Sequence, residues 1–357
     1  MRIGIMATTK KLYIHVGHQK CGSTTIQHWL KKQEKNLDKI GIKYLKTGRG
    51  ELGNSYVHHE LALEVLTNNF KNGKNLLFDN LQQEINNSDA EHFIISAENF
   101  IQITEKQQLQ QLRDCLPNNL ELHLVFIYRN QYQWLSSQWA QLAKNGTTFD
   151  DFDAWFERFS LSLRALKYNE ICDFWDEYFQ PSCLHILSFE DLVYSNSGLL
   201  SNFFDFIGIQ GIPSDLLQES KNYNISPSYK TILLCQKIFS YIKETEELSW
   251  LFLQEETIRT REKISKYIQE FAQHRGFNQE KIDFMSLEQK KQVFDYYYGS
   301  NLELIDRFAS RDKFRLFLKS PTESKNYMDI KKIITDLSPS LLNEAMAFVM
   351  VKLAEVK

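Results

Sequence analysis

The sequence predicts an α/β fold: a parallel β-sheet flanked by helices, followed by a helical C-terminal half. Two observations predict it. Short, strongly apolar segments alternate with helical patterns over about the first 210 residues, as in parallel sheets covered on both faces. Strand-like segments then stop after Gly208, and amphipathic patterns take over. We expect one domain over residues 1–317, with a sheet core at about 11–210, a helical part at about 211–317 and a helical tail at 318–357.

Composition limits the function classes. The chain has 357 residues, 43% of them hydrophobic and 24% charged, which suffices for a large core. A net charge of −3 offers no broad basic field, so nucleic acid is not an expected partner. We see neither a signal peptide nor a membrane-spanning apolar run, and we expect a cytoplasmic protein. The five cysteines form no CxxC pair and lie at no zinc spacing with histidines, so we expect neither disulfides nor a metal site.

Four segments are predicted as strands. They are residues 12–16, 92–96, 120–128 and 183–189. Helical periodicity predicts helices at 130–141, 161–179, 229–243, 248–271, 287–308 and 340–353. In a sheet of this kind, ligands bind outside the carboxyl ends of the strands, so the residues that follow each strand are the candidates for function.

The loop after the first strand is suited to a phosphate. It reads GHQKCGSTT from Gly17 to Thr25 and leads directly into a helix, whose N–H groups and dipole favour an anion. It differs from a Walker A loop, which has lysine directly after its second glycine, where this chain has Ser23. Lys20 lies inside the loop instead, where its ammonium can reach the bridging oxygen between a phosphate and a transferring group.

A second candidate phosphate site follows the strand at 120–128. Arg129 ends that strand, and Ser137 comes eight residues later, about two turns into a helix. A guanidinium and a hydroxyl together suit a phosphate monoester. Structural roles explain the two residues equally well: Arg129 as a surface ion-pair partner, and Ser137 as an incidental serine of the helix.

These two segments resemble the 5′-phosphosulfate loop and the 3′-phosphate motif of sulfotransferases that use 3′-phosphoadenosine-5′-phosphosulfate (PAPS). The similarity runs from about residue 11 to about 317, through blocks at 144–155, 168–179, 189–192, 203–209 and 222–226, and is weaker after Phe189. Ile26 stands where some members have a tryptophan that stacks on adenine, which puts the adenine contacts in doubt. The resemblance implies donor binding by His18, Gln19, Lys20, Cys21, Gly22, Ser23, Thr24, Thr25, Arg129 and Ser137.

Sulfuryl transfer also needs a base near the acceptor. Glu98 is the first candidate, because it lies just past the strand at 92–96, beside the other two loops. His58 and His59 are the rivals, at the start of an expected helix. Structural roles remain open for all three side chains. The sulfuryl group carries one negative charge, so no metal is required.

The sequence thus predicts an enzyme that transfers the sulfuryl group of PAPS to a hydroxyl or amine, with a carbohydrate as the expected acceptor and PAP (adenosine 3′,5′-bisphosphate) as product. The alternatives are a P-loop kinase or ATPase, and a catalytically inactive binding protein with the same fold. The tail is expected either to dock on its own chain or to mediate a homodimer.

Overall fold

The chain forms two compact units. The computed structural model describes residues 9–50, 55–70, 75–218, 228–245, 258–277, 282–327 and 337–355. Residues 1–130, 164–224 and 297–319 belong to the first unit, here the sheet unit, and residues 131–163, 225–296 and 320–357 to the second, here the helical unit. In this division, residues 131–163 group with the C-terminal helices and residues 297–319 group with the sheet, and the expected boundaries at 210 and 317 stay a prediction.

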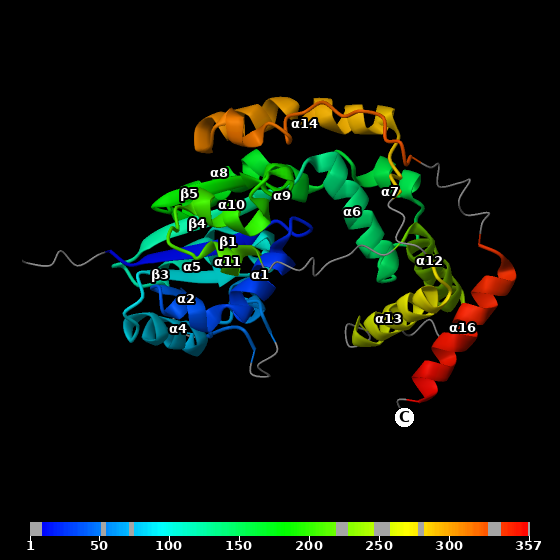
Figure 1. The fold of residues 1–357 in the computed structure, drawn as a ribbon, viewed down its shortest axis with the longest axis horizontal. Helices are drawn as coiled ribbons and strands as arrows, with labels where there is room; N and C mark the ends of the chain where they lie inside the picture. The colour runs from blue at the N-terminus through cyan, green and yellow to red at the C-terminus, as the bar shows by residue number, and fades with distance from the viewer. Residues whose placement is uncertain are drawn as a thin grey trace, which may run out of the picture. The chain divides into compact units, whose positions relative to one another are not determined.

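The sheet unit contains five parallel strands in the order β2-β3-β1-β4-β5 (Figure 1). The predicted α/β class is confirmed. The strands are β1 (Lys11–Gly17), β2 (Ile42–Tyr44), β3 (His92–Ser96), β4 (Glu121–Tyr128) and β5 (Cys183–Ser188). The short edge strand β2 was not predicted. β1 lies in the centre, so the loop that follows it opens at the middle of the sheet edge.

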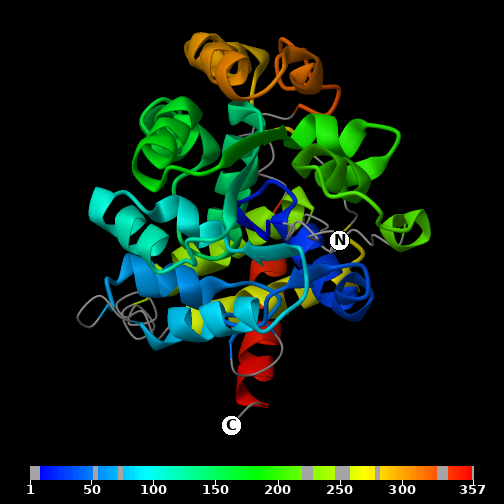
Figure 2. The ribbon, with the colours of Figure 1, turned by 90° about the vertical axis from the view of Figure 1, so that its left-hand side faces the viewer.

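Helices cover both faces of this sheet, as right-handed crossovers between parallel strands require. Figure 2 shows them on opposite sides of the strands. The helices of this unit are α1 (Ser23–Lys32), α2 (Glu34–Asp38), α3 (His59–Leu66), α4 (Leu76–Asn86), α5 (Lys106–Asp114), α8 (Tyr168–Phe179), α9 (Phe189–Tyr194), α10 (Gly198–Ile207) and α11 (Ser214–Gln218), with short 3₁₀ helices η1 (Glu98–Gln102), η2 (Arg164–Leu166) and η5 (Arg311–Phe314).

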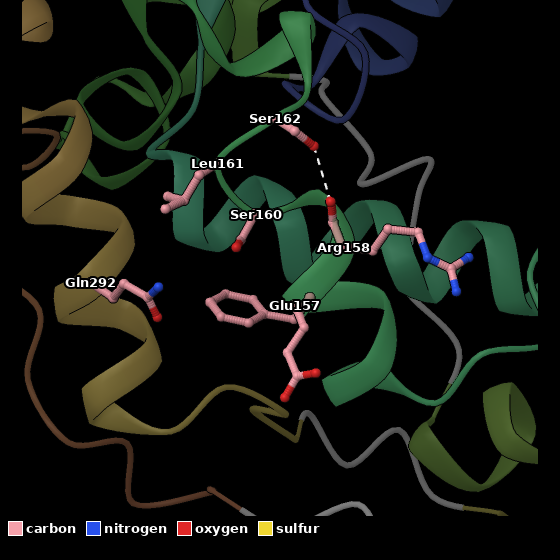
Figure 3. Close-up of a pocket in the computed structure, with 7 residues that line it drawn as sticks. Glu157, Arg158, Ser160, Leu161, Ser162 and Gln292 are labelled. Carbon is pink, nitrogen blue, oxygen red and sulfur yellow. Dashed lines mark hydrogen bonds between the residues drawn. The ribbon is translucent and has the colours of Figure 1, made fainter.

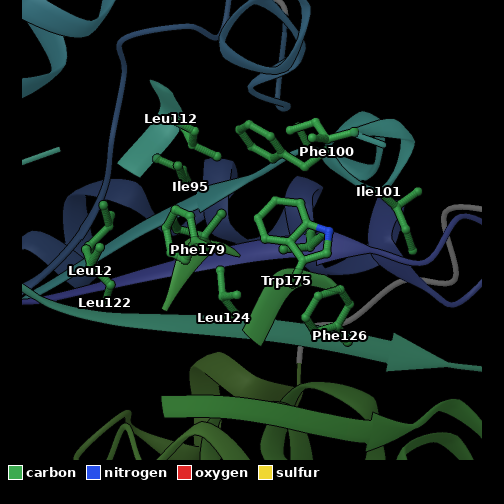
Figure 4. Packing of buried hydrophobic residues seen from close by; sticks show 14 of the residues in the cluster. Leu12, Ile95, Phe100, Ile101, Leu112, Leu122, Leu124, Phe126, Trp175 and Phe179 are labelled. Carbon is green, nitrogen blue, oxygen red and sulfur yellow. The ribbon is translucent and has the colours of Figure 1, made fainter. Parts of the chain in front are cut away.

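The larger core lies between the sheet and the helices α3, α4, α5 and α8, which pack on one of its faces. Alternate residues of each strand point into it, while their neighbours point to the opposite face. Phe126 of β4 meets the edge of the Trp175 ring of α8 at 6.0 Å between centroids (Figure 4). On the opposite face, Trp29 of α1 packs against Phe204 of α10. Burial of each large apolar side chain stabilises the fold by about 1.5–3 kcal/mol. This packing holds the strands in place, and with them the strand ends where the candidate site residues lie.

The helical unit contains α6 (Gln131–Lys144), α7 (Phe152–Phe159), α12 (Tyr229–Glu244), α13 (Ile258–His274) and α16 (Pro339–Ala354). The long helix α14 (Leu287–Phe308) supplies residues to both units. α16 packs on its own chain: Ala345 and Val349 join a core with α12 and α13, and Lys352 Nζ lies 3.6 Å from Glu270 Oε1. This agrees with the first of the two roles expected for the tail.

Several predicted helices are present with bounds close to those expected. α14 spans the predicted 287–308, α12 differs from its prediction by one residue at its C-terminal end, and α16 is one residue longer at each end. The helix predicted at 161–179 instead begins at Tyr168, after a turn and η2. The predicted block at 222–226 and the beginning of the predicted helix at 248–271 lie outside the described residues. Within the described residues, no helix has both the length and the apolarity that crossing a bilayer requires.

Candidate functional site

The loop between β1 and α1 has an unusual backbone. Gly17, Lys20 and Gly22 all have positive φ, at 141°, 67° and 82°. Lys20 is the only one of the three with a side chain, and a left-handed conformation costs such a residue about 1–2 kcal/mol. Hydrogen bonds hold the loop; among them, His18 N donates to Ile127 O (2.9 Å), and Ser23 Oγ donates to His18 O (3.1 Å).

The N-terminus of α1 has no side-chain cap. Its N-cap residue is Gly22, and its first turn has no acidic residue. A Cβ atom at Gly22 would lie 3.0 Å from Phe189 Cε2 and 3.2 Å from Leu199 Cδ2, so this position is closed to larger residues. Helix N-termini attract anions, and a capping carboxylate would compete with such a ligand. The local sequence therefore leaves this helix end available to a phosphate.

Arg129 follows β4 and extends to the same loop. Its Nη1 donates to Lys20 O (3.3 Å), and its guanidinium lies over the Phe189 ring, 5.1 Å from the centroid. The backbone of Arg129 is fixed by Tyr168, whose hydroxyl donates to Arg129 O (2.7 Å). Arg129 Nε is buried and makes no hydrogen bond. An unsatisfied buried donor on a permanent cation is costly, and an anion would satisfy it.

Glu190 is a contributor that the sequence analysis did not propose. It is 2% exposed, at the first turn of α9, and its Oε1 accepts from Asn130 N (2.9 Å). Burial raises its pKa, whereas the positive charge of Arg129 acts in the opposite direction. Glu190 thus fixes the backbone next to Arg129. Its position directly after a predicted strand was the available signal.

Glu98 lies where the sequence predicted, beside the loop. The Cβ position of Gly17 is 3.6 Å from Glu98 O, and the Glu98 carboxyl interacts with Ser23 and with the charge of Lys20. Burial raises the pKa of Glu98, and the hydrogen bond with Ser23 and the Lys20 charge oppose that shift. A partly buried carboxylate with a raised pKa is a stronger proton acceptor than an exposed one.

His58 is wholly buried and both of its ring nitrogens have partners. Nε2 lies 2.8 Å from Leu45 O and donates to it, and Nδ1 accepts from Ser96 N (3.1 Å). Burial lowers its pKa to about 3, so the ring is neutral. These contacts tie α3 to the end of β3, directly before Glu98. His59 is an exposed residue at the start of α3.

The other loop residues predicted to contact the donor have mixed surroundings. His18 is buried and neutral, with its pKa lowered to about 4 by burial, and its Nε2 lies 2.9 Å from Ala165 O. Cys21 is fully buried, and burial raises its pKa well above the usual value, so it is a packing thiol. Gln19, Thr24 and Thr25 are partly exposed.

Ser137 belongs to the helical unit, in α6, while Arg129 belongs to the sheet unit. The structure therefore brings together the loop, Glu98 and Arg129 within one unit. The pairing of Arg129 with Ser137 stays a prediction.

The helical unit has a hollow of about 330 Å³ between the segment 156–162 and Gln292. In Figure 3, the side chains of Ser160, Leu161 and Gln292 point toward a shared space, and Ser162 Oγ donates to Arg158 O (3.0 Å). No residue predicted for the site lines this hollow. We assign it no part in the chemistry.

Comparisons with known proteins add little. No protein-family model matches the chain, and no curated protein matches it. Among solved structures, the chain is similar to the crystal structure of a sulfotransferase from Alicyclobacillus acidocaldarius, with 15% identity and a TM-score of 0.34, over 59% of this chain and 89% of that one. Both values are low, and this likeness assigns no role to any residue of the chain.

Proposed function

We propose that this protein is a sulfotransferase that moves the sulfuryl group of PAPS onto a hydroxyl or amine of an acceptor. One observation carries the proposal. Lys20 is held in a left-handed conformation between an uncapped helix N-terminus and Arg129, which hydrogen-bonds to its carbonyl. Both neighbours favour an anion, and the lysine lies at the centre of the loop rather than at its end.

The roles follow from charge. The 5′-phosphate of the donor binds at the start of α1, and the Lys20 ammonium lies at the oxygen that bridges phosphorus and sulfur. The acceptor oxygen or nitrogen forms a new bond to sulfur as the bond from sulfur to the bridging oxygen breaks, and PAP leaves with the electron pair. Lys20 stabilises the charge that develops on that oxygen, and Glu98 takes the proton of the acceptor.

Arg129 is assigned to the 3′-phosphate of the donor, together with Ser137 as the sequence predicts. The buried Nε of Arg129 has no hydrogen-bond partner, which fits a ligand that supplies an acceptor. No metal is part of this proposal, because Lys20, Arg129 and the helix dipole supply the positive charge. The carbohydrate acceptor rests on the family resemblance, and the cytoplasmic location is proposed from the scattered cysteines of the sequence.

A P-loop kinase or ATPase is the first alternative, and it needs a magnesium-binding acid at a strand end. The acids after β5 already serve the fold: Glu190 binds Asn130 N, and Asp191 accepts from Leu316 N and Phe317 N at 3.0 and 3.2 Å. The second alternative is an inactive binding protein. Its site would bind PAP, and it would show no turnover.

Thermal unfolding with different nucleotides separates the alternatives. PAP without magnesium should raise the melting temperature, since a ligand at 100 times its Kd stabilises by about 2.7 kcal/mol. ATP with magnesium is the matched probe for a kinase. A shift with ATP and magnesium, and none with PAP, would sink the proposal.

Turnover is then measured with sulfur-labelled PAPS and a panel of glycans. Label in a glycan product supports the full proposal. Label in a phenol or amine instead would support the sulfuryl transfer but show that the acceptor is not a carbohydrate. PAP binding without label in any acceptor supports the inactive binding protein.

A further inference from the structure

A second cluster of reactive side chains lies in the sheet unit, away from the candidate site. His123 of β4 and Cys183 of β5 are register partners, and His185 is two residues further along β5. Alternate residues of a strand share a face, so all three lie on one face of the sheet. They lie at the amino ends of β4 and β5, whereas Arg129 and Glu190 follow the carboxyl ends.

Donor atoms of the three side chains converge. His123 Nδ1 lies 2.9 Å from His185 Nε2, and one donor atom from each residue, including Cys183 Sγ, lies within 4.8 Å of the others. The two rings are stacked, with centroids 5.2 Å apart and 16° between planes. His123 is only 8% exposed, whereas Cys183 and His185 are partly exposed, which leaves a route for an ion to enter.

Each imidazole has a neighbour besides the other ring, although the buried Nε2 of His123 makes no hydrogen bond. The ring of His185 hydrogen-bonds with the backbone of Phe206 in α10, and Glu121 Oε2 lies 3.6 Å from His123 Nε2. A carbonyl or carboxylate on the far nitrogen is the usual neighbour of a metal-binding histidine, because it aims the near nitrogen at the ion. In this cluster the near nitrogens are the two that face each other.

We propose that His123, Cys183 and His185 form a binding site for a divalent transition metal, Zn²⁺, with one coordination position left for water. Two imidazoles and a thiolate are a donor set that zinc accepts. A tetrahedral zinc site, with Zn–N of about 2.0–2.1 Å and Zn–S of about 2.3 Å, places its donor atoms about 3.4–3.6 Å apart. The observed separations, 2.9 Å between the two nitrogens and no more than 4.8 Å for the others, lie on either side of that range. Binding would release the thiol proton of Cys183 to solvent, and the proton shared by the two near nitrogens would move to His123 Nε2, on the side of Glu121, so that both rings stay neutral.

The charged neighbours of the cluster include one that favours zinc binding and two that oppose it. Tyr13 packs over the His123 ring at 4.7 Å, and Glu121 adds a negative charge. Lys11, which pairs with Glu121 at 3.6 Å, and Lys313 are the nearby cations. The thiolate and Glu121 together balance the two charges of the ion. The site joins two neighbouring strands, so we assign it a stabilising role separate from catalysis.

The test uses the full chain, freed of metal by a chelator and then titrated with Zn²⁺ or with Co²⁺ as a coloured probe. We expect one equivalent of Zn²⁺ per chain, and a thiolate-to-cobalt charge-transfer band. Cys183→Ser should abolish that band and weaken zinc binding at least 10-fold. The double variant with His185→Gln should lose detectable binding. Cys115→Ser is the matched control, because Cys115 lies at the end of α5 and should retain both signals.

Thermal unfolding without metal shows whether the variants fold, since Cys183 and His185 are partly exposed. Added Zn²⁺ should raise the melting temperature of the wild type and of Cys115→Ser, and leave the double variant unchanged. Absence of binding in the wild type overturns the proposal, as does equal binding in the folded double variant. Because PAP binding does not involve this cluster, donor affinity should be the same in the double variant, and failure here is distinguishable from failure of the sulfotransferase proposal.

Discussion

The two ends of the sheet carry side chains of opposite chemical character, although both are built on the same strands. At the carboxyl ends, Lys20, Arg129 and the N-terminus of α1 present positive charge and N–H donors. At the amino ends, His123, Cys183 and His185 present lone pairs. The first set suits an anion, and the second suits a cation.

The difference teaches what sets ligand preference in such a fold. In a parallel sheet, loops at the carboxyl ends lead into helix N-termini, and the backbone itself contributes donors there. The amino ends lie near helix C-termini, where the backbone contributes carbonyl acceptors rather than donors. Independent variants at each end should therefore change one ligand and leave the other.

Lys20→Ala should have the largest effect. Removing a cation from the leaving oxygen should lower kcat by about 10³- to 10⁵-fold, as loss of a comparable arginine does in phosphoryl transfer. Turnover of labelled PAPS measures it, with the melting temperature as the folding check. Lys31→Ala, in the last turn of α1, is the control and should leave kcat unchanged. Near-normal turnover in Lys20→Ala would remove this lysine from the reaction.

Glu98→Gln should lower kcat by about 10²- to 10⁴-fold, the usual contribution of a general base. PAP affinity should change little. Because burial raises the pKa of Glu98, the ionised fraction grows as pH rises through that raised value. Wild-type kcat should therefore rise with pH over that interval, and the variant should lack this limb. Glu105→Gln, an exposed carboxylate before α5, is the control. An unchanged pH profile in Glu98→Gln would contradict the assignment.

Arg129→Lys should weaken PAP binding by about 10- to 100-fold, because a hydrogen bond to a charged group contributes about 1.5–3 kcal/mol. A lysine keeps the charge and loses the planar fork of donors. Calorimetric titration with PAP measures the change. Arg113→Lys in α5 should bind as the wild type does. Zinc binding should be identical in both variants. Loss of zinc binding in Arg129→Lys would show that the two ends of the sheet are coupled, contrary to our proposal.

The histidine variants should have the smallest effect on chemistry. His59→Gln should retain kcat within about 2-fold, since its side chain is exposed and helix surfaces tolerate change. His58→Gln should keep most activity and lower the unfolding free energy by about 1–3 kcal/mol, because two buried hydrogen bonds are disturbed. A large fall in kcat for a folded His59→Gln variant would indicate that His59, and not Glu98, is the general base.

Local sequence patterns predicted the parts of the fold that local physics controls. Continuous apolar runs identified β1, β3, β4 and β5, and helical periodicity identified α12, α14 and α16. The strand β2 was missed because three residues are too few for a period to appear. The turn before α8 was missed because the apolar spacing continues through residues 161–167 while the backbone does not.

Long-range contacts set what could be expected of the candidate site. The placement of Glu98 beside the loop could be predicted, because both follow neighbouring parallel strands. The contact between Arg129 and the Lys20 carbonyl could not, since it depends on loop backbone angles. The cluster of His123, Cys183 and His185 was equally hidden: His123 lies about sixty residues before the other two, and only strand register brings it to them.

The left-handed backbone of Lys20 has a consequence for how this protein can change. A glycine at that position would adopt the same φ without a steric penalty, so Lys20→Gly should leave the fold at least as robust as the alanine variant while removing the ammonium. The proposed role of the ammonium gives a reason for a lysine in this conformation. Selection for stability alone would favour glycine at this position, whereas selection for turnover would keep the lysine. Stability and activity therefore make opposite demands on this residue.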